Sequence, residues 1–490
     1  MIRGKIFLLE TPVEEKNKAR TVGPNETYPL GMAYLDTVLK KEGFEVRTID
    51  FANWDDEKAM NKIEEIIVEF KPNIVGFSVM TMTRVSTYRA IKKIKEINKD
   101  IKIILGGMHP TMMYEQLLLN FPIEAVVIGE GEITTVELAN ALMQNKSLTK
   151  IRGIAYKNGP KVMVTPERDL IQDLDSLPFP NHEAFMNSKR IGVCILSTRG
   201  CPYQCSFCCL HEITRRRYRK RSVSNVIAEI EYILNRFPQI KEVEFSDDTL
   251  TLDEDRVIEF CKEVVKKRIN HRIKFICSGR IKPCSYELLS WMAQAGFREI
   301  RFGIETGSRE LLKNIHKNVT PEDIIETFKI CAHFKDKIKF VKFLMVGFPG
   351  ETWDTVNETI QLTNELHKHV PMDFFCATVL WVYPGTEIYN LMKSEGDIDD
   401  NYWLTDKPCP RYTKEYTESE QSKMADHIAF MGALNRGIPY LVQRVLRKIK
   451  ENPRYELKRI VWNKFGIKQL MNLVKNKQDL NKSLKIENGI

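Results

Sequence analysis

The first third of the chain alternates short apolar runs with longer stretches in which apolar residues recur at helical spacing. Met32, Leu35, Val38 and Leu39 show that helical spacing. Continuous apolar strands separated by helices are typical of a parallel sheet that is covered on both faces. The pattern therefore predicts a doubly wound α/β domain over residues 1–145. The expected strands are KIFLLE (5–10), EVRTIDF (45–51), IVGFSVM (74–80), KIILGG (102–107) and AVVIGE (125–130).

Five strand–helix units in this order suit a flavodoxin-like (Rossmann-like) domain, whose ligands lie beyond the carboxyl ends of the strands. A β-hairpin and linker are expected next, over residues 146–190. The hairpin would turn at Asn158-Gly159, and Pro178 and Pro180 mark the linker.

Strand and helix patterns resume at Gly192 and continue to about residue 398. Six such units predict a partial (β/α)6 barrel of the TIM type over residues 191–405. A helical and basic C-terminal extension is expected over residues 406–490. The expected barrel strands are VCILST, EVEFSDD, IKFICSG, EIRFGIE, IKFVKFLMVG and FFCATVLWV.

Small or polar residues follow several strands of the first domain. Glycine lets a ligand approach the backbone closely, although tight strand-to-helix turns also use glycine. Because the carboxyl ends of parallel strands share one edge of a sheet, these residues together indicate a site for a large ligand. They are Ser78, Met80 and Thr81 after the third strand, Gly106, Gly107 and His109 after the fourth, and Gly129, Glu130 and Gly131 after the fifth.

Composition and charge narrow the function classes. Hydrophobic residues make up 43% and charged residues 28% of the chain, and no apolar run approaches the roughly 18 residues that a membrane span needs. The N-terminus lacks the features of a signal peptide, so a cytoplasmic protein is expected. From Met431 onward there are 14 Lys or Arg against four Asp or Glu, and the rest of the chain is close to neutral. We therefore expect no nucleic-acid-binding body.

The basic C-terminal segment contains one amphipathic stretch, IPYLVQRVLRKIK (438–450). Such a helix could lie on an anionic membrane, which would place the protein peripherally at the inner membrane surface. Packing against the barrel with a solvated basic face is the alternative.

The 11 cysteines are concentrated in the middle of the chain, and the first is Cys194. Cys201, Cys205 and Cys208 form a CxxxCxxC motif directly after a predicted strand. Three thiolates can bind a 4Fe-4S cluster and leave one iron open for another ligand. A structural zinc site is the alternative, and it would need a fourth ligand such as Cys209 or His211.

CxxxCxxC with the aromatic Phe207 before its last cysteine resembles the signature of the radical S-adenosylmethionine (radical SAM) superfamily. The resemblance covers residues 190 to 400. It implies that the open iron binds S-adenosylmethionine and that Phe207 lies near the adenine. Asp247 in EFSDDTL, Arg280 in SGR and Glu305 in FGIETGS stand where the superfamily contacts this ligand. The alternative for the acidic residues is a salt bridge at the barrel rim.

Three motifs of the first domain are similar to those of the cobalamin-binding radical SAM enzymes: PLGMAYL (29–35), GGMHPT (106–111) and VIGEGE (127–132). This resemblance implies that the strand-end residues named above bind cobalamin. The DxHxxG motif, whose histidine binds cobalt in many cobalamin domains, is absent. His109 is then expected to form hydrogen bonds, and a domain that binds no cobalamin remains the alternative.

The resemblance implies an enzyme of an anaerobic host that takes one electron from a flavodoxin or ferredoxin. It would cleave S-adenosylmethionine to a 5′-deoxyadenosyl radical and act as a class B methyltransferase on an unactivated carbon of a small molecule. The membrane alternative for the tail favours a hydrophobic substrate. Two other functions stay open: a radical cyclase or ring-rearranging enzyme, and a regulator without turnover that binds corrinoid or S-adenosylmethionine. No cysteine precedes Cys194, which argues against a methylthiotransferase with a second cluster.

Overall fold

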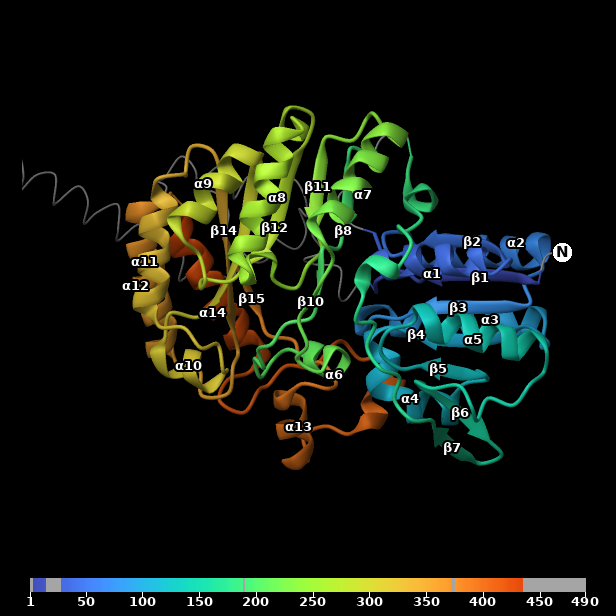
Figure 1. Cartoon of the computed structure of the whole chain (residues 1–490). Helices are drawn as coiled ribbons and strands as arrows, with labels where there is room; N and C mark the ends of the chain where they lie inside the picture. Colours follow the sequence, from blue (N-terminus) through green and yellow to red (C-terminus); the bar gives the residue numbers. More distant parts are fainter. Residues whose placement is uncertain (1–2, 15–27, 188–189, 372–374, 435–490) are drawn as a thin grey trace, which may run out of the picture. The chain divides into compact units, whose positions relative to one another are not determined.

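The computed structural model describes residues 3–14, 28–187, 190–371 and 375–434 (Figure 1). The basic stretch predicted at 438–450 lies outside these residues. None of the helices within the described residues combines the length and the apolar character that crossing a membrane would require.

The N-terminal domain is built on a seven-stranded sheet in the order β2-β1-β3-β4-β5-β6-β7. The first five strands are parallel, which is the flavodoxin-like order, and β6 and β7 add an antiparallel hairpin at one edge. The strands are β1 (Lys5–Glu10), β2 (Glu45–Asp50), β3 (Ile74–Ser78), β4 (Lys102–Gly106), β5 (Ala125–Val127), β6 (Ile154–Asn158) and β7 (Lys161–Val164). The helices are α1 (Leu30–Lys41), α2 (Asp56–Phe70), α3 (Arg84–Ile97), α4 (Met108–Asn120) and α5 (Glu132–Met143).

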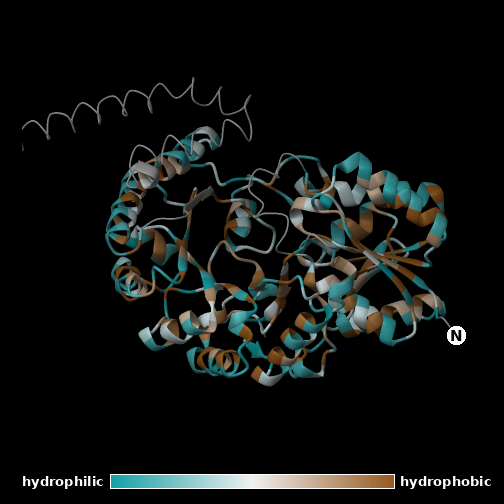
Figure 2. Ribbon diagram, turned by 90° about the horizontal axis from the view of Figure 1, so that it is seen from above, coloured by the Kyte–Doolittle hydropathy of each residue, from teal (hydrophilic) through white to brown (hydrophobic). Residues whose placement is uncertain are grey.

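Apolar side chains of this sheet are buried on both faces. Figure 2 shows the hydrophobic strands between helices that are hydrophilic on their outer sides. Phe7 and Leu9 of β1 pack in one core with Ile63 of α2, whereas Ile6 and Leu8 pack in another with Leu39 of α1. Alternate residues of a strand face opposite sides of a sheet, so β1 is hydrophobic throughout its length.

The second sheet has six strands in the order β15-β14-β13-β12-β11-β8, and every pairing is parallel. Figure 1 shows the helices on its outer side. This arrangement confirms the predicted fold class. The strands are β8 (Gly192–Ile195), β11 (Glu242–Phe245), β12 (Lys274–Gly279), β13 (Phe297–Glu305), β14 (Lys339–Val346) and β15 (Phe375–Val379). The helices are α7 (Val223–Arg236), α8 (Glu254–Lys266), α9 (Tyr286–Ala295), α10 (Arg309–Asn314), α11 (Pro321–Ala332), α12 (Trp353–His369), α13 (Glu387–Ser394) and α14 (Glu418–Leu434).

Two very short strands, β9 (Thr198–Arg199) and β10 (Arg219–Lys220), form a separate antiparallel ribbon. The chain between them carries the cysteine motif and the short helix α6 (Leu210–Thr214). Gly200 follows β9 with φ of 91°, and a Cβ atom there would lie 2.1 Å from the carbonyl oxygen of Arg217. Glycine is therefore required where the two ends of this loop meet.

Candidate functional site

The carboxyl ends of the N-terminal strands open into a cavity of about 450 Å³, which we call the strand-end cavity. Its lining includes Leu8 of β1 and Leu30 and Gly31 of α1. Arg199, Gly200 and Asp248 complete it from the barrel side. Six of the residues predicted to bind cobalamin line this cavity: Ser78, Gly106, Gly107, Gly129, Glu130 and Gly131.

Much of the wall of the strand-end cavity is bare backbone. A Cβ atom on Gly31 or Gly129 would meet no other atom within 4 Å. At Gly107, where φ is 103°, a Cβ atom would lie 2.9 Å from the carbonyl oxygen of Val79. Glycines that open the wall in this way let a large ligand approach the backbone, so the residues present fit a corrin ring held by shape.

A second cavity of about 550 Å³, the cysteine cavity, lies at the carboxyl ends of the barrel strands. Cys201, Cys205 and Cys208 line it together with Phe207. Three soft thiol donors at one cavity suit an iron–sulfur cluster. No three Cys, His, Asp or Glu side chains of the described ranges are drawn together as closely as a single bound metal ion would require.

Burial acts on the ionisation of two of the three thiols, Cys201 and Cys208. Burial raises the pKa of the Cys208 thiol to about 12, and the neighbouring cysteines add to the effect. Burial also raises the pKa of Cys201. Iron binding to these two thiols would therefore release protons.

Arg280 and Glu305 face the cysteine cavity from the ends of β12 and β13. The Arg280 guanidinium lies 3.5 Å from the ring centre of Tyr203 and donates to the carbonyl of Lys317. Its Nε atom is buried and has no hydrogen-bond partner among the described residues. Lys317 Nζ lies 2.6 Å from Glu305 Oε1. An unpartnered buried guanidinium atom fits a site that awaits an acceptor such as a carboxylate.

The two aspartates after β11 differ from the sequence prediction. Asp247, predicted to contact S-adenosylmethionine, is buried and lines neither cavity. Its carboxylate accepts hydrogen bonds from the Ser197 backbone, the Ser197 hydroxyl and the Thr198 hydroxyl at 2.6–2.7 Å. Asp248 instead lines both cavities and accepts one hydrogen bond, from the Gly200 backbone at 3.0 Å. Of the two, only Asp248 points toward the ligand space.

Burial of Asp248 among protein atoms raises its pKa to about 6, and the neighbouring Asp247 adds to the rise. The sequence prediction named Asp247, whereas Asp248 is the member of the pair that lines the cavities. The local sequence holds no signal that separates the two, because the contacts to Ser197 and Thr198 are distant in the chain.

The residues predicted after β3 and β4 also divide between the two cavities. Met80 and Thr81 line the cysteine cavity rather than the strand-end cavity. His109 lines neither cavity and is completely buried. Its ring nitrogens lie 3.3 Å from the hydroxyls of Tyr88 and Thr81. Burial lowers its pKa to about 3, with a further contribution from Arg84, so His109 is a neutral hydrogen-bonding residue behind the wall.

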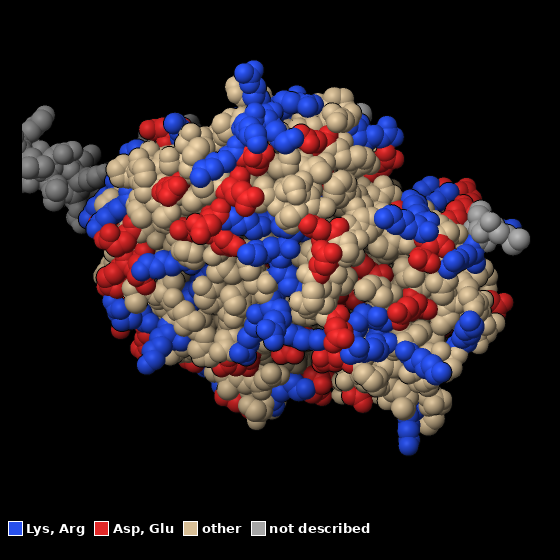
Figure 3. Space-filling view, in the orientation of Figure 1, with Lys and Arg blue, Asp and Glu red and all other residues tan. Residues whose placement is uncertain are grey.

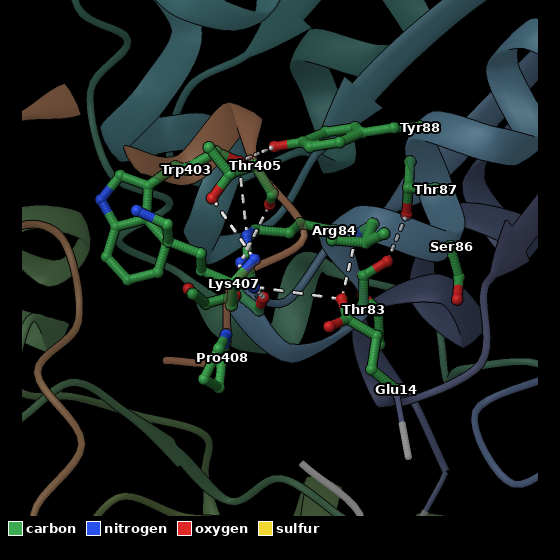
Figure 4. A network of polar contacts seen from close by, with 12 residues as sticks. Glu14, Thr83, Arg84, Ser86, Thr87, Tyr88, Trp403, Thr405, Lys407 and Pro408 are labelled. Carbon is green, nitrogen blue, oxygen red and sulfur yellow. Dashed lines mark hydrogen bonds and ion pairs between the residues drawn. The ribbon is translucent and has the colours of Figure 1, made fainter. Parts of the chain in front are cut away.

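Arg84 links the turn after β3 to residues 403–407 through hydrogen bonds, as Figure 4 shows. The completely buried guanidinium donates to the carbonyls of Trp403, Thr405 and Lys407 and to that of Thr81. Glu14 lies 3.9 Å away and accepts from the backbone of Val85. Thr81 lines the cysteine cavity, so Arg84 fixes one part of that lining.

Ion pairs connect the rim of the strand-end cavity to the base of the cysteine loop, the name we give to residues 200–218 between β9 and β10. Arg199 lies 3.0 Å from Glu130 and 2.6 Å from Glu132, and Arg219 lies 2.9 Å from Glu130. Burial alone would raise the pKa of Glu130, but hydrogen bonds and charges from Arg219 and Arg199 outweigh it and lower that pKa. Arg199 and Arg219 are opposite each other in the backbone register of the antiparallel β9–β10 ribbon. Glu130, predicted to contact cobalamin, therefore also positions the cysteine loop.

Three residues line both cavities: Met108, Leu210 and Asp248. Met108 begins α4 in the N-terminal domain, and the other two come from the barrel side. Sequence reasoning did not single out Met108 or Leu210, because a lone apolar residue gives no signal for its position between two ligands. The two cavities thus adjoin at one common wall.

The architecture is a doubly wound domain joined to a partial barrel that carries the cysteine loop. Comparisons with known proteins identify the family to which this architecture belongs. The family model of the B12 binding domain matches residues 18–139, and that of the Radical SAM superfamily matches residues 195–363. The uncharacterized methyltransferase PH0819 of Pyrococcus horikoshii is 33% identical over 410 residues, which span 82% of this chain and 84% of that protein.

Two further proteins are similar to this chain. The anaerobic magnesium-protoporphyrin IX monomethyl ester cyclase of Rubrivivax gelatinosus is 30% identical over 69% of this chain, and the match covers 62% of that protein. The structure of the radical S-adenosylmethionine methyltransferase TsrM from Kitasatospora setae, with cobalamin and a [4Fe-4S] cluster bound, has a TM-score of 0.66 at 22% identity. The structural match covers 81% of this chain and 75% of the TsrM chain. The chain belongs to the family of radical SAM enzymes that carry a B12-binding domain.

Proposed function

We propose that this enzyme is a cobalamin-dependent radical SAM methyltransferase that acts on an unactivated carbon of a small molecule. The observation that carries the proposal is the common wall of Met108, Leu210 and Asp248 between the two cavities. A carbon atom placed there is accessible from both ligand sites at once, as transfer between them requires. The similarity to PH0819, named a methyltransferase, supports the same reaction.

Cys201, Cys205 and Cys208 would bind the 4Fe-4S cluster, and the strand-end glycines would hold cobalamin against bare backbone. When bound, the cluster supplies the electron that cleaves S-adenosylmethionine, and cobalamin supplies the methyl group to be transferred.

The charged side chains of the cysteine cavity would orient S-adenosylmethionine. The unpartnered Nε atom of Arg280 would donate to its carboxylate. Asp248, in place of the predicted Asp247, would accept from its amino group, since Asp248 faces the cavity and accepts a single hydrogen bond from the residues that the structure describes. Phe207 would pack beside the adenine. Glu305 is already paired with Lys317, so we propose that it fixes the lysine and not the ligand directly.

The first test requires no knowledge of the substrate. The protein is purified without oxygen in the presence of cobalamin and incubated with a low-potential reductant and S-adenosylmethionine labelled at its S-methyl group with deuterium. We expect about four irons and one corrinoid per chain, release of 5′-deoxyadenosine, and a corrinoid mass increased by one labelled methyl group. A corrinoid that never acquires the label, in protein that does release 5′-deoxyadenosine, would contradict methyl transfer.

A cyclase-like reaction is the second candidate, because the Rubrivivax gelatinosus cyclase is 30% identical to this chain. This candidate predicts radical formation and corrinoid binding without labelling of the corrinoid. With a substrate in hand, the product mass separates the two: methylation adds one methyl group, whereas cyclisation does not. We also propose that the open cluster makes the enzyme oxygen-sensitive, which loss of iron on exposure to air would show.

A further inference from the structure

A run of basic residues ends the cysteine loop and continues into β10. Arg215, Arg216, Arg217, Arg219 and Lys220 lie within six positions, immediately after α6. Arg219 is buried and paired with Glu130, but the other four side chains are exposed. Figure 3 shows Lys and Arg side chains gathered on the face where Figure 1 draws α6 and β10. We call Arg215, Arg216, Arg217 and Lys220 the basic loop.

Two charges of the basic loop are not neutralised. Arg215 lies 3.0 Å from Glu167 and Lys220 lies 2.6 Å from Asp253. Arg216 and Arg217 form no ion pair with any residue in the part of the chain that the structure describes. Arg215 and Arg216 both have left-handed backbone conformations, with φ of 50° and 56°. Non-glycine residues rarely adopt this conformation, and such strain concentrates at functional sites.

The basic loop lies beside the thiols that would hold the cluster. The carbonyl of Arg217 packs so closely on Gly200 that only glycine fits there, and Gly200 precedes Cys201. With 3.8 Å between successive Cα atoms, the Arg217 carbonyl is within about 8 Å of the Cys201 backbone. Pro202 and Gln204 are exposed and line neither large cavity, whereas Cys201, Tyr203 and Cys205 face the cysteine cavity. The cysteine loop therefore has one side toward the cavity and one toward solvent.

We propose that the basic loop is the docking surface for the protein that reduces the cluster, a small acidic electron carrier with a flavin or an iron–sulfur centre. The inference rests on the proposed function only in requiring a redox-active cluster on the three thiols. In the step itself the carrier loses one electron and the cluster gains it. Unpaired surface cations attract an acidic protein and increase its association rate, which is how electrostatic steering acts.

The test compares two reductants on the reconstituted holoenzyme. Cluster reduction is followed by absorbance and by electron paramagnetic resonance, first with photoreduced flavodoxin and then with dithionite, which needs no protein surface. We expect the double variant Arg216→Glu, Arg217→Glu to lower the second-order rate constant with flavodoxin about 10-fold or more. The rate with dithionite should stay within about twofold of the parent, and the parent's decrease in flavodoxin rate with added salt should become shallower.

A matched control places the same charge change elsewhere. Lys335 and Lys337 are exposed and lie just before β14 begins. They are therefore at the opposite end of the parallel barrel strands from the cysteine loop. Lys335→Glu, Lys337→Glu should leave the flavodoxin rate within about twofold. Iron content is measured in every protein, and Arg216→Gln, Arg217→Gln provides a milder variant if the reversal lowers cluster content.

Three results would overturn the proposal. The first is a flavodoxin rate in the parent that is zero or independent of salt. The second is an equal loss with dithionite in a variant that retains its iron, which would indicate a structural role for the arginines. The third is tight binding of a short RNA duplex to the parent that the substitutions abolish while flavodoxin reduction is unchanged, because the loop would then be a polyanion site. If the reconstituted parent holds no iron and binds no flavodoxin, the result would instead count against the assignment of the cluster to the three thiols.

Discussion

The strand-end cavity and the cysteine cavity adjoin, but they are built from different materials. The first is lined mostly by apolar side chains and by glycines that expose backbone, and its charged residues apart from the shared Asp248 are paired with one another. The second contains thiols and two charged groups, Arg280 and Asp248, that have no ion-pair partner among the described residues. The difference indicates that the first ligand is recognised by shape and the second by charge and coordination. A larger side chain in the lining should therefore weaken ligand binding in the first cavity. Removal of the thiols or charged groups should weaken it in the second.

The largest effect should come from the thiols. Replacing Cys201, Cys205 and Cys208 together by alanine removes every donor of the cluster, and we expect iron to fall to background. Corrinoid content should stay within about twofold, because the strand-end cavity uses none of these side chains. Cys209→Ala is the control: it should retain about four irons. Loss of metal in that control would indicate a four-thiol site, and zinc in the parent would contradict the cluster.

Bulk in the strand-end cavity should have the next largest effect. Gly31 is in helix α1, and its Cβ position meets no atom within 4 Å, so leucine there would project into the cavity. We expect Gly31→Leu to weaken hydroxocobalamin binding by at least about 100-fold, or roughly 2.7 kcal/mol. Iron content should not change, and the melting temperature should not fall, since leucine favours helix over glycine.

Gly31→Ala adds a single methyl group and should bind cobalamin within about threefold of the parent. Equal binding by the leucine variant, measured by titration of the corrinoid spectrum, would show that the corrin does not occupy this cavity.

The burial of His109 behind the cavity lining can be tested through the pH dependence of the free energy of unfolding. Its pKa is lowered to about 3, so protonation is disfavoured in the folded protein. The stability that its neutral form contributes is complete above the unfolded value of about 6.5 and is lost as the pH falls toward 3. Between pH 7 and 5 the loss from this residue should be about 2 kcal/mol. In His109→Gln this part of the acid dependence should vanish in urea unfolding curves. An unchanged slope would mean that the ring is protonated or accessible in the folded protein.

The smallest effect concerns the ion pairs that join the two regions. Glu130 contacts the base of the cysteine loop and lines the strand-end cavity, so cobalamin affinity should depend on whether the cluster is present. In the parent we expect the iron-free and iron-loaded proteins to differ about 10-fold in hydroxocobalamin affinity, a coupling of about 1.4 kcal/mol. Glu130→Gln should reduce that ratio toward one.

Glu137→Gln is the control for this last prediction, because Glu137 pairs with Arg168 outside both cavity linings. It should preserve the coupling. Equal affinities in the parent with and without iron would mean that the two cavities are independent in spite of their shared wall.

The fold was predictable because periodicity determines it locally. Every strand expected in the two sheets is present, since runs such as KIFLLE are apolar on both faces and have no stable place except inside a covered sheet. The boundaries of the regions and the roles of the individual site residues stay predictions. The sequence predicts well which residue types follow each strand. It does not predict the direction of each side chain, because that direction depends on contacts with residues distant in the chain.

Asp247 and His109 illustrate what could not be predicted. Asp247 is adjacent to Asp248 in the sequence, and the choice between them is made by Ser197 and Thr198, about 50 residues away, whose hydroxyls bind only the first. Similarly, His109 follows the exposed glycines directly but is drawn inward by Tyr88 and Thr81. Met80 and Thr81 were expected near cobalamin, but the turn after β3 carries them into the lining of the other cavity. In each case a contact distant in sequence decides which ligand a residue meets.

The β9–β10 ribbon has a consequence for the evolvability of this family. The ribbon is hydrogen-bonded to neither large sheet, and its two strands close the cysteine loop upon itself. Residues 200–218 therefore form a loop whose ends meet at Gly200 and Arg217, so substitutions at its exposed positions need not disturb the barrel strands. The solvent-facing side of this loop can thus change while its contacts to the cavity and to the barrel are retained.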